Sequence, residues 1–424
     1  MKQNYQIFTL ENGLRLIIVP DNSKGVLTSM VLFGVGSRYE SDQIAGISHV
    51  LEHMFYKGSK KRPNSTLISE FIEDIGGEHN AFTSKEYTGY YTKVASKYLE
   101  KSLDFLSDLL INPLFDAKEL EQEKFVIIQE LKMYEDLPME VASSKFEQAL
   151  LGDNGLGRDV IGFEKSILSL QRDDLVKYKE SHYTASNGVV VLAGNIGELS
   201  VEEVKKLVAK YFLFPTGIQS RYPEINLNTK KALEIVEKKT EQSNLLIGFR
   251  GADFNNDDKY ALKLLSMILG GSMSSRMFVE IREKRGLAYA VRTSSSSYQD
   301  TGVIETYAGV THERVLEATK AILTEYRRVF DDLVESEVGR AKEIIYGRML
   351  ISAEDTTEIA NHFALQTLLG KKILTLDEIS KLYEKVTLSD IISTGKKYLT
   401  DQNLALGFVG QNVTKEEIEK ILKF

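Results

Sequence analysis

Two histidines four residues apart, with a glutamate between them, stand in the segment His-Val-Leu-Glu-His at His49–His53. On a helix, residues i and i+4 lie on one face, so both imidazoles can reach the same ion. Glu52 lies within about 100° of both histidines around the helix axis. It can therefore reach a water on that ion without being a ligand. Two neutral imidazoles and one carboxylate suit Zn²⁺ and leave a fourth position for water, whose proton Glu52 would take.

The alternative for this segment is a partly exposed helix with two incidental histidines. The chain has 6 histidines in 424 residues. At that frequency, a chance His-x-x-Glu-His occurs in roughly one such chain in a hundred or fewer. The metal interpretation is therefore favoured, and it requires a third ligand elsewhere in the chain.

A long helical pattern at Ala117–Tyr134 supplies candidates for that third ligand. Glu130 ends its apolar run, and Glu123 lies seven residues earlier on nearly the same face. Two stacked carboxylates repel each other unless a cation or a donor receives them. We assign Glu130 as the ligand and Glu123 as a second-shell residue that orients or tunes the site. A solvated helix face is the alternative, and periodicity alone leaves open three further acidic residues: Glu119, Glu121 and Glu135.

Strand and helix patterns alternate along the chain and must position these residues. Alternating or apolar segments predict strands at Arg15–Val19, Leu27–Phe33 and Tyr87–Val94. Helical spacing predicts helices at Thr66–Ile75, Leu99–Leu110 and Ala117–Tyr134. Such a mixture indicates an α/β or α+β fold.

A linker is predicted at residues 215–230, where two of the 6 prolines, Pro215 and Pro223, flank Gly217. It divides the chain into predicted domains 1–214 and 231–424 and is a candidate hinge. The two halves also match each other at an offset of 218 residues, which indicates a duplicated unit. The chemistry is not duplicated. At this offset His49, Glu52, His53, Glu123 and Glu130 face Met267, Gly270, Gly271, Ala341 and Arg348.

Composition excludes several classes of protein. The formal charge is -8, with no basic excess of the kind that nucleic-acid-binding domains show. Cysteine is absent, which removes disulfides, thiolate metal sites and cysteine nucleophiles. No apolar run approaches the ~20 residues that span a bilayer, and the first residues show no signal-peptide pattern. We expect a soluble, cytoplasmic protein without nucleic-acid or membrane partners.

Several segments resemble the pitrilysin/insulinase family of zinc metallopeptidases, the inverzincins. The similarity covers nearly the whole chain, and its length matches the two-domain subunits of mitochondrial processing peptidase and prokaryotic relatives. One departure is Asp153–Gly162, where many relatives have a His-Pro-Leu-Gly stretch. The segments that carry the resemblance are GSRYESDQIAGISH, HVLEHMFYKGS, GGEHNAFTSKEYTGYY, EKFVIIQE, HYTASNGVVVLAGNI and GGSMSSRMFVEIREKRGLAYAV.

This resemblance implies a zinc-dependent endopeptidase with one Zn²⁺ per chain. His49, His53 and Glu130 would be the ligands, Glu52 the catalytic base on the zinc-bound water, and Glu123 the additional acidic position of the motif. The implied fold is α+β: two tandem homologous domains, each a mostly antiparallel sheet packed with helices, which form half of a clamshell. Peptides and unfolded polypeptide segments would be cleaved inside its closed chamber.

The resemblance also implies a substrate-contact pair, Arg282 and Tyr289, in the half without ligands. In single-chain relatives with four domains, zinc lies in the first domain and this pair in the fourth. A two-domain chain is therefore expected to form a homodimer with composite active sites, or a heterodimer with a related chain. A helix arginine with acidic neighbours is otherwise usually a solvated ion-pair partner.

Asn80, Ala81 and Phe82 begin an alternating stretch directly after a Gly-Gly pair. If they lie on an exposed edge strand, an extended peptide can pair with their backbone, which predicts substrate binding of broad specificity. Two other functions remain open. One is a catalytically silent scaffold or assembly subunit of a processing-peptidase-like or respiratory complex, and such relatives typically lose part of the metal motif. The other is a different metal-dependent hydrolase.

Overall fold

The computed structural model describes residues 4–225, 227 and 230–424. Within these residues the strands form two sheets, one of six strands and one of five. Contacts divide the chain into two compact units. Each unit combines three separate segments. The first comprises Met1–Leu131, Asp159–Glu224 and Met349–Asp377, and the second comprises Lys132–Arg158, Ile225–Arg348 and Glu378–Phe424.

The first unit is built on a sheet with the strand order β1-β2-β6-β3-β5-β4, which leaves β1 and β4 at the edges. Only the β2–β6 pair is parallel among the described pairs of this sheet. Every residue of β6 is buried, as expected for a strand covered on both faces. The strands are β1 (Gln6–Thr9), β2 (Arg15–Pro20), β3 (Val26–Phe33), β4 (Glu78–Thr83), β5 (Thr88–Ala95) and β6 (Gly188–Gly194).

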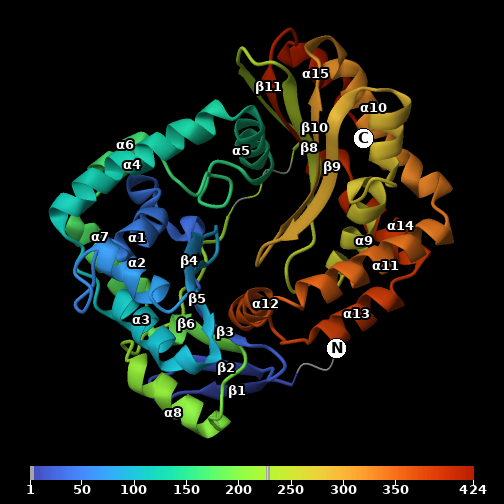
Figure 1. Cartoon of the computed structure of the whole chain (residues 1–424). Helices are drawn as coiled ribbons and strands as arrows, with labels where there is room; N and C mark the ends of the chain where they lie inside the picture. The colour runs from blue at the N-terminus through green and yellow to red at the C-terminus, as the bar shows by residue number, and fades with distance from the viewer. Residues whose placement is uncertain (1–3, 226, 228–229) are drawn as a thin grey trace. The chain divides into compact units, whose positions relative to one another are not determined.

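Helices cover both faces of this first sheet: Figure 1 shows α1, α2 and α3 on one side and α12 on the other. The core between α1, α3 and the sheet is apolar and includes Phe55, Tyr90 and Phe105. The helices that belong mainly to this unit are α1 (Ile47–Phe55), α2 (Ser65–Glu73), α3 (Leu99–Ile111), α4 (Ala117–Asp136), α6 (Glu164–Ser169), α7 (Arg172–His182), α8 (Val201–Tyr211) and α12 (Thr356–Leu369).

The second unit repeats this plan with the strand order β7-β11-β8-β10-β9. Its strands are β7 (Ala232–Glu237), β8 (Ser243–Gly251), β9 (Ala288–Ser297), β10 (Gly302–Val310) and β11 (Leu404–Gly410). Its helices are α5 (Pro138–Leu151), α9 (Asp258–Gly270), the short π-helix η5 (Phe278–Lys284), α10 (Val315–Asp332), α11 (Glu335–Ser352), α13 (Leu376–Lys385), α14 (Leu388–Tyr398) and α15 (Lys415–Ile421). The predicted α+β class with two mostly antiparallel sheets is confirmed.

The internal repeat is visible in the topology. In both sheets a parallel pair, β2–β6 or β7–β11, is followed by antiparallel neighbours in the same order. The long helices α4 and α11 begin at Ala117 and Glu335, which lie 218 residues apart, as the sequence offset predicts. The predicted strands and helices of the first half are all present, with ends shifted by at most two residues.

The two units exchange one helix each. After α4, the helix α5 packs on β8 and β11 of the second unit, and after α11 the helix α12 packs on β3 and β6 of the first. In the second core Ala142 and Phe146 of α5 lie against Leu246, Ala405 and Val409. The compact units therefore differ from the contiguous ranges 1–214 and 231–424 that composition and repeats suggested. One boundary between the two units, at Glu224/Ile225, falls within the predicted linker.

The first part of that linker is fixed to the first unit. The Pro215 carbonyl accepts a hydrogen bond from the Ala185 N–H at 2.9 Å. The buried Arg38 guanidinium lies 4.3 Å from the centre of the Tyr222 ring and donates to the Pro223 carbonyl at 3.2 Å. A hinge within residues 215–230 would therefore have to lie after Pro223. Residues 226, 228 and 229 of this segment lie outside the described residues. Across the described part of the chain, no helix has the length and apolarity needed to cross a membrane.

Candidate metal centre

Helix α1 presents one apolar and one polar face. Ile47, Val50, Leu51, Met54 and Phe55 are all fully buried, and their spacing is that of one helical stripe. The stripe packs into the first core. The histidines and the glutamate of the motif are left on the opposite, less buried face. The apolar pattern therefore fixes the direction in which the chemical groups point.

The start of α1 is held by a buried carboxylate and a tight backbone contact. Glu40 accepts hydrogen bonds from the Gly46 and Ser48 N–H groups at 2.7 and 2.9 Å. Gly46 has φ +93°, and a Cβ there would lie 2.4 Å from the Ile161 carbonyl oxygen, so glycine is required. The last residues of the segment Asp153–Gly162 thus support the metal-motif helix, although its sequence departs from that of many relatives.

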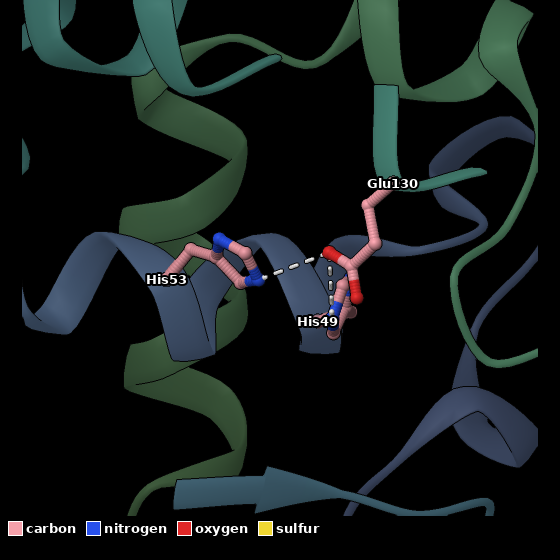
Figure 2. Close-up of side chains that lie close together, drawn as sticks. All are labelled: His49, His53 and Glu130. Atoms are coloured by element: carbon pink, nitrogen blue, oxygen red, sulfur yellow. Dashed lines mark ion pairs between the residues drawn. The ribbon is translucent and has the colours of Figure 1, made fainter. Parts of the chain in front are cut away.

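His49, His53 and Glu130 converge in the structure (Figure 2). The Glu130 Oε2 lies 3.8 Å from His49 Nε2 and 3.6 Å from His53 Nε2. Ligands at about 2.1 Å from a tetrahedral Zn²⁺ are roughly 3.4 Å apart, so these separations are close to those of a zinc site. The three candidate ligands thus fit this ion in type and spacing. The competing acidic residues Glu121 and Glu135 are exposed and lie outside this cluster of described residues.

The protonation state of His49 favours coordination of a metal. Burial, and to a lesser extent the neighbouring His53, lower the pKa of this imidazole to about 3. The ring is therefore neutral at ordinary pH and has a free lone pair for a metal. Its second nitrogen, Nδ1, is buried and has no hydrogen-bond partner among the residues that the structure describes.

Glu123 lies behind His53 rather than beside Glu130. Its Oε1 is 2.7 Å from His53 Nδ1, and its Oε2 is 2.5 Å from the Lys57 ammonium. Burial would raise the pKa of the Glu123 carboxyl, but the hydrogen bonds from His53 and Lys57 outweigh burial and lower it. A carboxylate on Nδ1 fixes the tautomer that leaves Nε2 free for a metal. The sequence analysis predicted that Glu123 orients or tunes the site, and this contact would allow it to orient the His53 ring.

Glu52 lies close enough to His53 and Glu130 to feel their charges, and its carboxylate is held by Thr83 of strand β4. The Thr83 hydroxyl donates to Glu52 Oε2 at 2.5 Å. Burial raises the pKa of the Glu52 carboxyl, and the Thr83 hydrogen bond and the His53 charge offset part of this rise. A raised pKa brings a carboxylate closer to the range in which it can take up a proton near neutrality.

Strand β4, which carries Asn80, Ala81 and Phe82, lies at an edge of the first sheet, which is the condition that the predicted substrate binding requires. The Ser84 N–H donates to the Tyr87 carbonyl in the turn between β4 and β5. Because paired groups alternate along an antiparallel ladder, the backbone of Ala81 and Thr83 faces the free edge. An extended chain could therefore form hydrogen bonds with β4 next to the Glu52 contact.

Arg282 and Tyr289 lie side by side in the second unit. The Arg282 guanidinium is 4.8 Å from the centre of the Tyr289 ring and 4.7 Å from that of Phe278. Arg282 lies in the π-helix η5, a type of helix frequent at functional sites. The Tyr289 side chain is 81% exposed. The pair therefore presents a guanidinium and a phenol at the surface of its unit.

The equivalent place in the second unit holds an arginine instead of metal ligands. Arg348, which aligns with Glu130, donates to the Gly271 carbonyl at 2.8 Å and lies 3.9 Å from the Met267 sulfur. Gly271 and Met267 align with His53 and His49. The second unit thus retains the pairing of the two helices, but there the Arg348 guanidinium binds at the C-terminal end of α9.

Two contacts of the candidate centre were missed by the sequence analysis. Lys57 and Arg62 belong to a short basic segment directly after α1, and nothing in the local sequence marks their ion pairs with distant carboxylates. Arg62 is buried in ion pairs with Asp104 and Asp108. Thr83 lies 31 residues from Glu52, and no local pattern marks their contact.

The fold is a duplicated α+β chain, and its described residues contain one cluster of two imidazoles and a carboxylate that could hold a metal. Residues 16–163 match the insulinase domain of peptidase family M16, and residues 169–345 match the domain described as the M16 inactive domain. Among the relatives is an uncharacterized zinc protease of Bacillus subtilis, 35% identical over 403 residues, which cover 94% of this chain and 97% of that relative. An uncharacterized zinc protease of Rickettsia bellii is 32% identical over 401 residues, 94% and 95% of the two chains. The chain belongs to the insulinase peptidase family, M16, as its motifs predicted.

Solved structures share the whole fold. A protease from Helicobacter pylori has a TM-score of 0.90 at 23% identity and covers 96% of this chain and 100% of its own. A chain of Complex III2 from Candida albicans has a TM-score of 0.85 at 17% identity and covers 99% and 100%. At such identities the likeness shows the fold alone.

Proposed function

We propose that this chain is a zinc-dependent endopeptidase that cleaves peptides and unfolded polypeptide segments. The observation that carries the proposal is the convergence of His49, His53 and Glu130 from two helices. The family and its relatives named zinc proteases support it. Hydrolysis of an internally quenched peptide by the purified protein, with loss of hydrolysis on chelation, tests it.

In this proposal each residue has a separate role. His49, His53 and Glu130 hold the ion, and Glu123 orients the His53 ring through Nδ1. Bound Zn²⁺ supplies Lewis-acid chemistry that acidifies a water and polarises a carbonyl. Glu52 accepts the proton of the attacking water and delivers it to the leaving amine. The Thr83 hydroxyl positions the Glu52 carboxylate for both transfers.

The substrate is proposed to bind as an added strand along β4. The Ala81 N–H already donates to Asn80 Oδ1 at 2.9 Å. The Ala81 carbonyl and the outward backbone groups of Thr83 could bond to any extended peptide, so the backbone would contribute affinity and little sequence preference. Asn80 and Phe82 flank these groups on the same strand. Unfolded segments fit this mode, because a folded protein has few free backbone stretches to offer.

A Thr83→Val variant tests the positioning of the base. Valine has the shape of threonine but cannot donate to Glu52. A hydrogen bond to a charged group contributes about 1.5–3 kcal/mol, so we expect kcat to fall roughly 10- to 100-fold with KM and zinc content unchanged. Steady-state kinetics on a quenched peptide, with metal analysis of the same samples, measure this.

Thr83→Ser is the matched control, because serine keeps the hydroxyl. It should retain most of the wild-type kcat. Equal rates for the valine and serine variants would mean that the hydroxyl does not position Glu52.

We further propose that the active enzyme is a homodimer with composite sites. The candidate zinc ligands belong to the first unit, and Arg282 with Tyr289 belongs to the second. In four-domain relatives the corresponding pair comes from the fourth domain and not from the second, so we propose that a partner chain supplies the pair to each site here. There, an arginine and a tyrosine hydroxyl can stabilise the developing oxyanion.

Mixing two inactive variants tests this assembly. Glu52→Gln and Arg282→Ala chains, each nearly inactive alone, should regain activity when subunits exchange, because one site of a mixed dimer has both residues intact. Half of the dimers would be mixed, so recovery should approach about a quarter of the wild-type rate.

Subunit exchange is verified separately with differently labelled chains. If exchange is complete and no activity returns, Arg282 acts within its own chain or is a surface arginine.

The alternative function is a catalytically silent assembly subunit. The match of residues 169–345 to the M16 inactive domain and the fold shared with a Complex III2 chain are compatible with it. The inactive-domain match, however, lies wholly outside the segment that carries His49, His53 and Glu130. All three candidate ligands and Glu52 are present, which favours the enzyme.

A further inference from the structure

We propose that Lys57 is a positioning residue of the metal centre. It holds Glu123, Glu123 holds His53, and zinc affinity therefore depends on a lysine outside the ligand motif. The proposal rests on the zinc binding proposed above but not on peptidase activity. Its test measures zinc binding and needs no peptide substrate.

The contacts form a continuous chain from Lys57 to the cluster. The Lys57 ammonium lies 2.5 Å from Glu123 Oε2, and Glu123 Oε1 lies 2.7 Å from His53 Nδ1. The opposite nitrogen of the same ring, Nε2, faces Glu130. Both oxygens of Glu123 are thus engaged, one by a cation and one by the ring that it orients.

Burial makes the position of Glu123 sensitive to Lys57. Glu123 is only 4% exposed, whereas the Lys57 side chain is 28% exposed and reaches solvent. A buried carboxylate that loses its cation is destabilised and turns toward water. That movement weakens its hold on His53, because the ring then lacks a fixed acceptor.

The charges around the site also require a cation. Three carboxylates lie around His53: Glu123 and Glu130 are 2.7 and 3.6 Å from its two ring nitrogens, and Glu52 precedes it in the chain. One divalent ion would leave a net negative charge among these groups. Lys57 supplies the balancing positive charge. It contacts Glu123 and not the three candidate ligands, so it does not compete with the metal ion for them.

The internal repeat provides a comparison within the same chain. At the offset of 218 residues, Lys57, Glu123 and His53 correspond to Ser275, Ala341 and Gly271. The two helices are retained in the second unit, yet all three members of the contact chain are replaced together. The lysine is therefore not needed for this pairing of helices, which is the expectation for a residue that serves the metal site.

The test is the zinc affinity of Lys57→Met, measured by competition between apo-protein and a fluorescent chelator for Zn²⁺ alone. Loss of an outer partner of a metal ligand typically costs 10- to 100-fold in affinity, and we expect about tenfold. Lys57→Arg should restore affinity close to wild type. Glu123→Gln should weaken zinc binding, and adding Lys57→Met to it should weaken binding no further, because Lys57 acts through Glu123.

Lys93→Met is the matched control. Lys93 forms an ion pair with Asp355 at 3.0 Å in the same unit, and its side chain is 26% exposed. The Lys93→Met variant should bind zinc with the affinity of the wild-type protein. Thermal unfolding of the apo-proteins shows whether either variant is merely destabilised.

Three results would overturn the proposal. The first is equal zinc affinity for Lys57→Met and Lys93→Met. The second is an additive loss in the double variant, which would mean that Lys57 acts independently of Glu123. The third is wild-type protein that binds no zinc, which would also overturn the proposed function. Tight zinc binding without peptide hydrolysis would overturn the peptidase proposal alone.

Discussion

A Glu52→Gln chain is expected to fold and bind zinc like wild type while its peptide hydrolysis falls by about 10²–10⁴-fold. Glutamine has nearly the same shape and can still contact the Thr83 hydroxyl, but it cannot take up a proton. Glu52 is not one of the three clustered candidate ligands, so its amide should leave the metal in place. Kinetics on a quenched peptide and metal analysis of the same preparation measure both properties.

Glu135→Gln is the control for this substitution. Glu135 is an exposed glutamate on α4, outside the candidate centre. Its variant should hydrolyse the peptide at the wild-type rate. Hydrolysis by Glu52→Gln within a few-fold of wild type would place the base elsewhere. The inactive variant would also retain bound peptides, and their identification by mass spectrometry would give the natural substrates.

The His49→Ala/His53→Ala chain is expected to lose zinc altogether. Wild-type protein should carry about one equivalent per chain, and removal of two of three ligands leaves a single carboxylate, which binds Zn²⁺ weakly. Hydrolysis should fall to background for the same reason. Elemental analysis after dialysis against metal-free buffer measures the zinc content.

His79→Ala serves as its control. His79 lies on β4 near the site, and its ring stacks on Tyr56 at 5.4 Å instead of joining the cluster. This variant should keep its zinc. Stoichiometric zinc in the double alanine chain would refute the ligand assignment.

Much of the fold was predictable because the patterns are local. The strand β3 and the helices α3 and α4 follow directly from alternating and helical spacing, which only the residues of each segment determine. The exchange of α5 and α12 between units was not predictable. Both helices are apolar enough to pack on either sheet, and spacing carries no information about which sheet is covered.

The candidate site likewise has features that the local sequence predicts and features that depend on residues far away in the sequence. The spacing of His49 and His53 on one helix is a local property, so their shared face could be predicted. Glu130 was assigned from its place at the end of an apolar run and from the family resemblance, whereas periodicity alone left Glu119, Glu121 and Glu135 open. The approach of α4 to α1 decides which carboxylate converges, and helical spacing does not encode that approach. Lys57 and Thr83 were missed because their partners, Glu123 and Glu52, lie far away in the sequence.

The central claim is that zinc held by His49, His53 and Glu130 makes this chain a peptidase. Its most direct test is a titration of chelator-treated wild-type protein with Zn²⁺, with hydrolysis of a quenched peptide followed at each addition. We predict that hydrolysis is absent without metal, rises in proportion to added zinc, and reaches its plateau at about one equivalent per chain. Hydrolysis that persists in the metal-free protein, or that never appears although one equivalent is bound, would contradict this account.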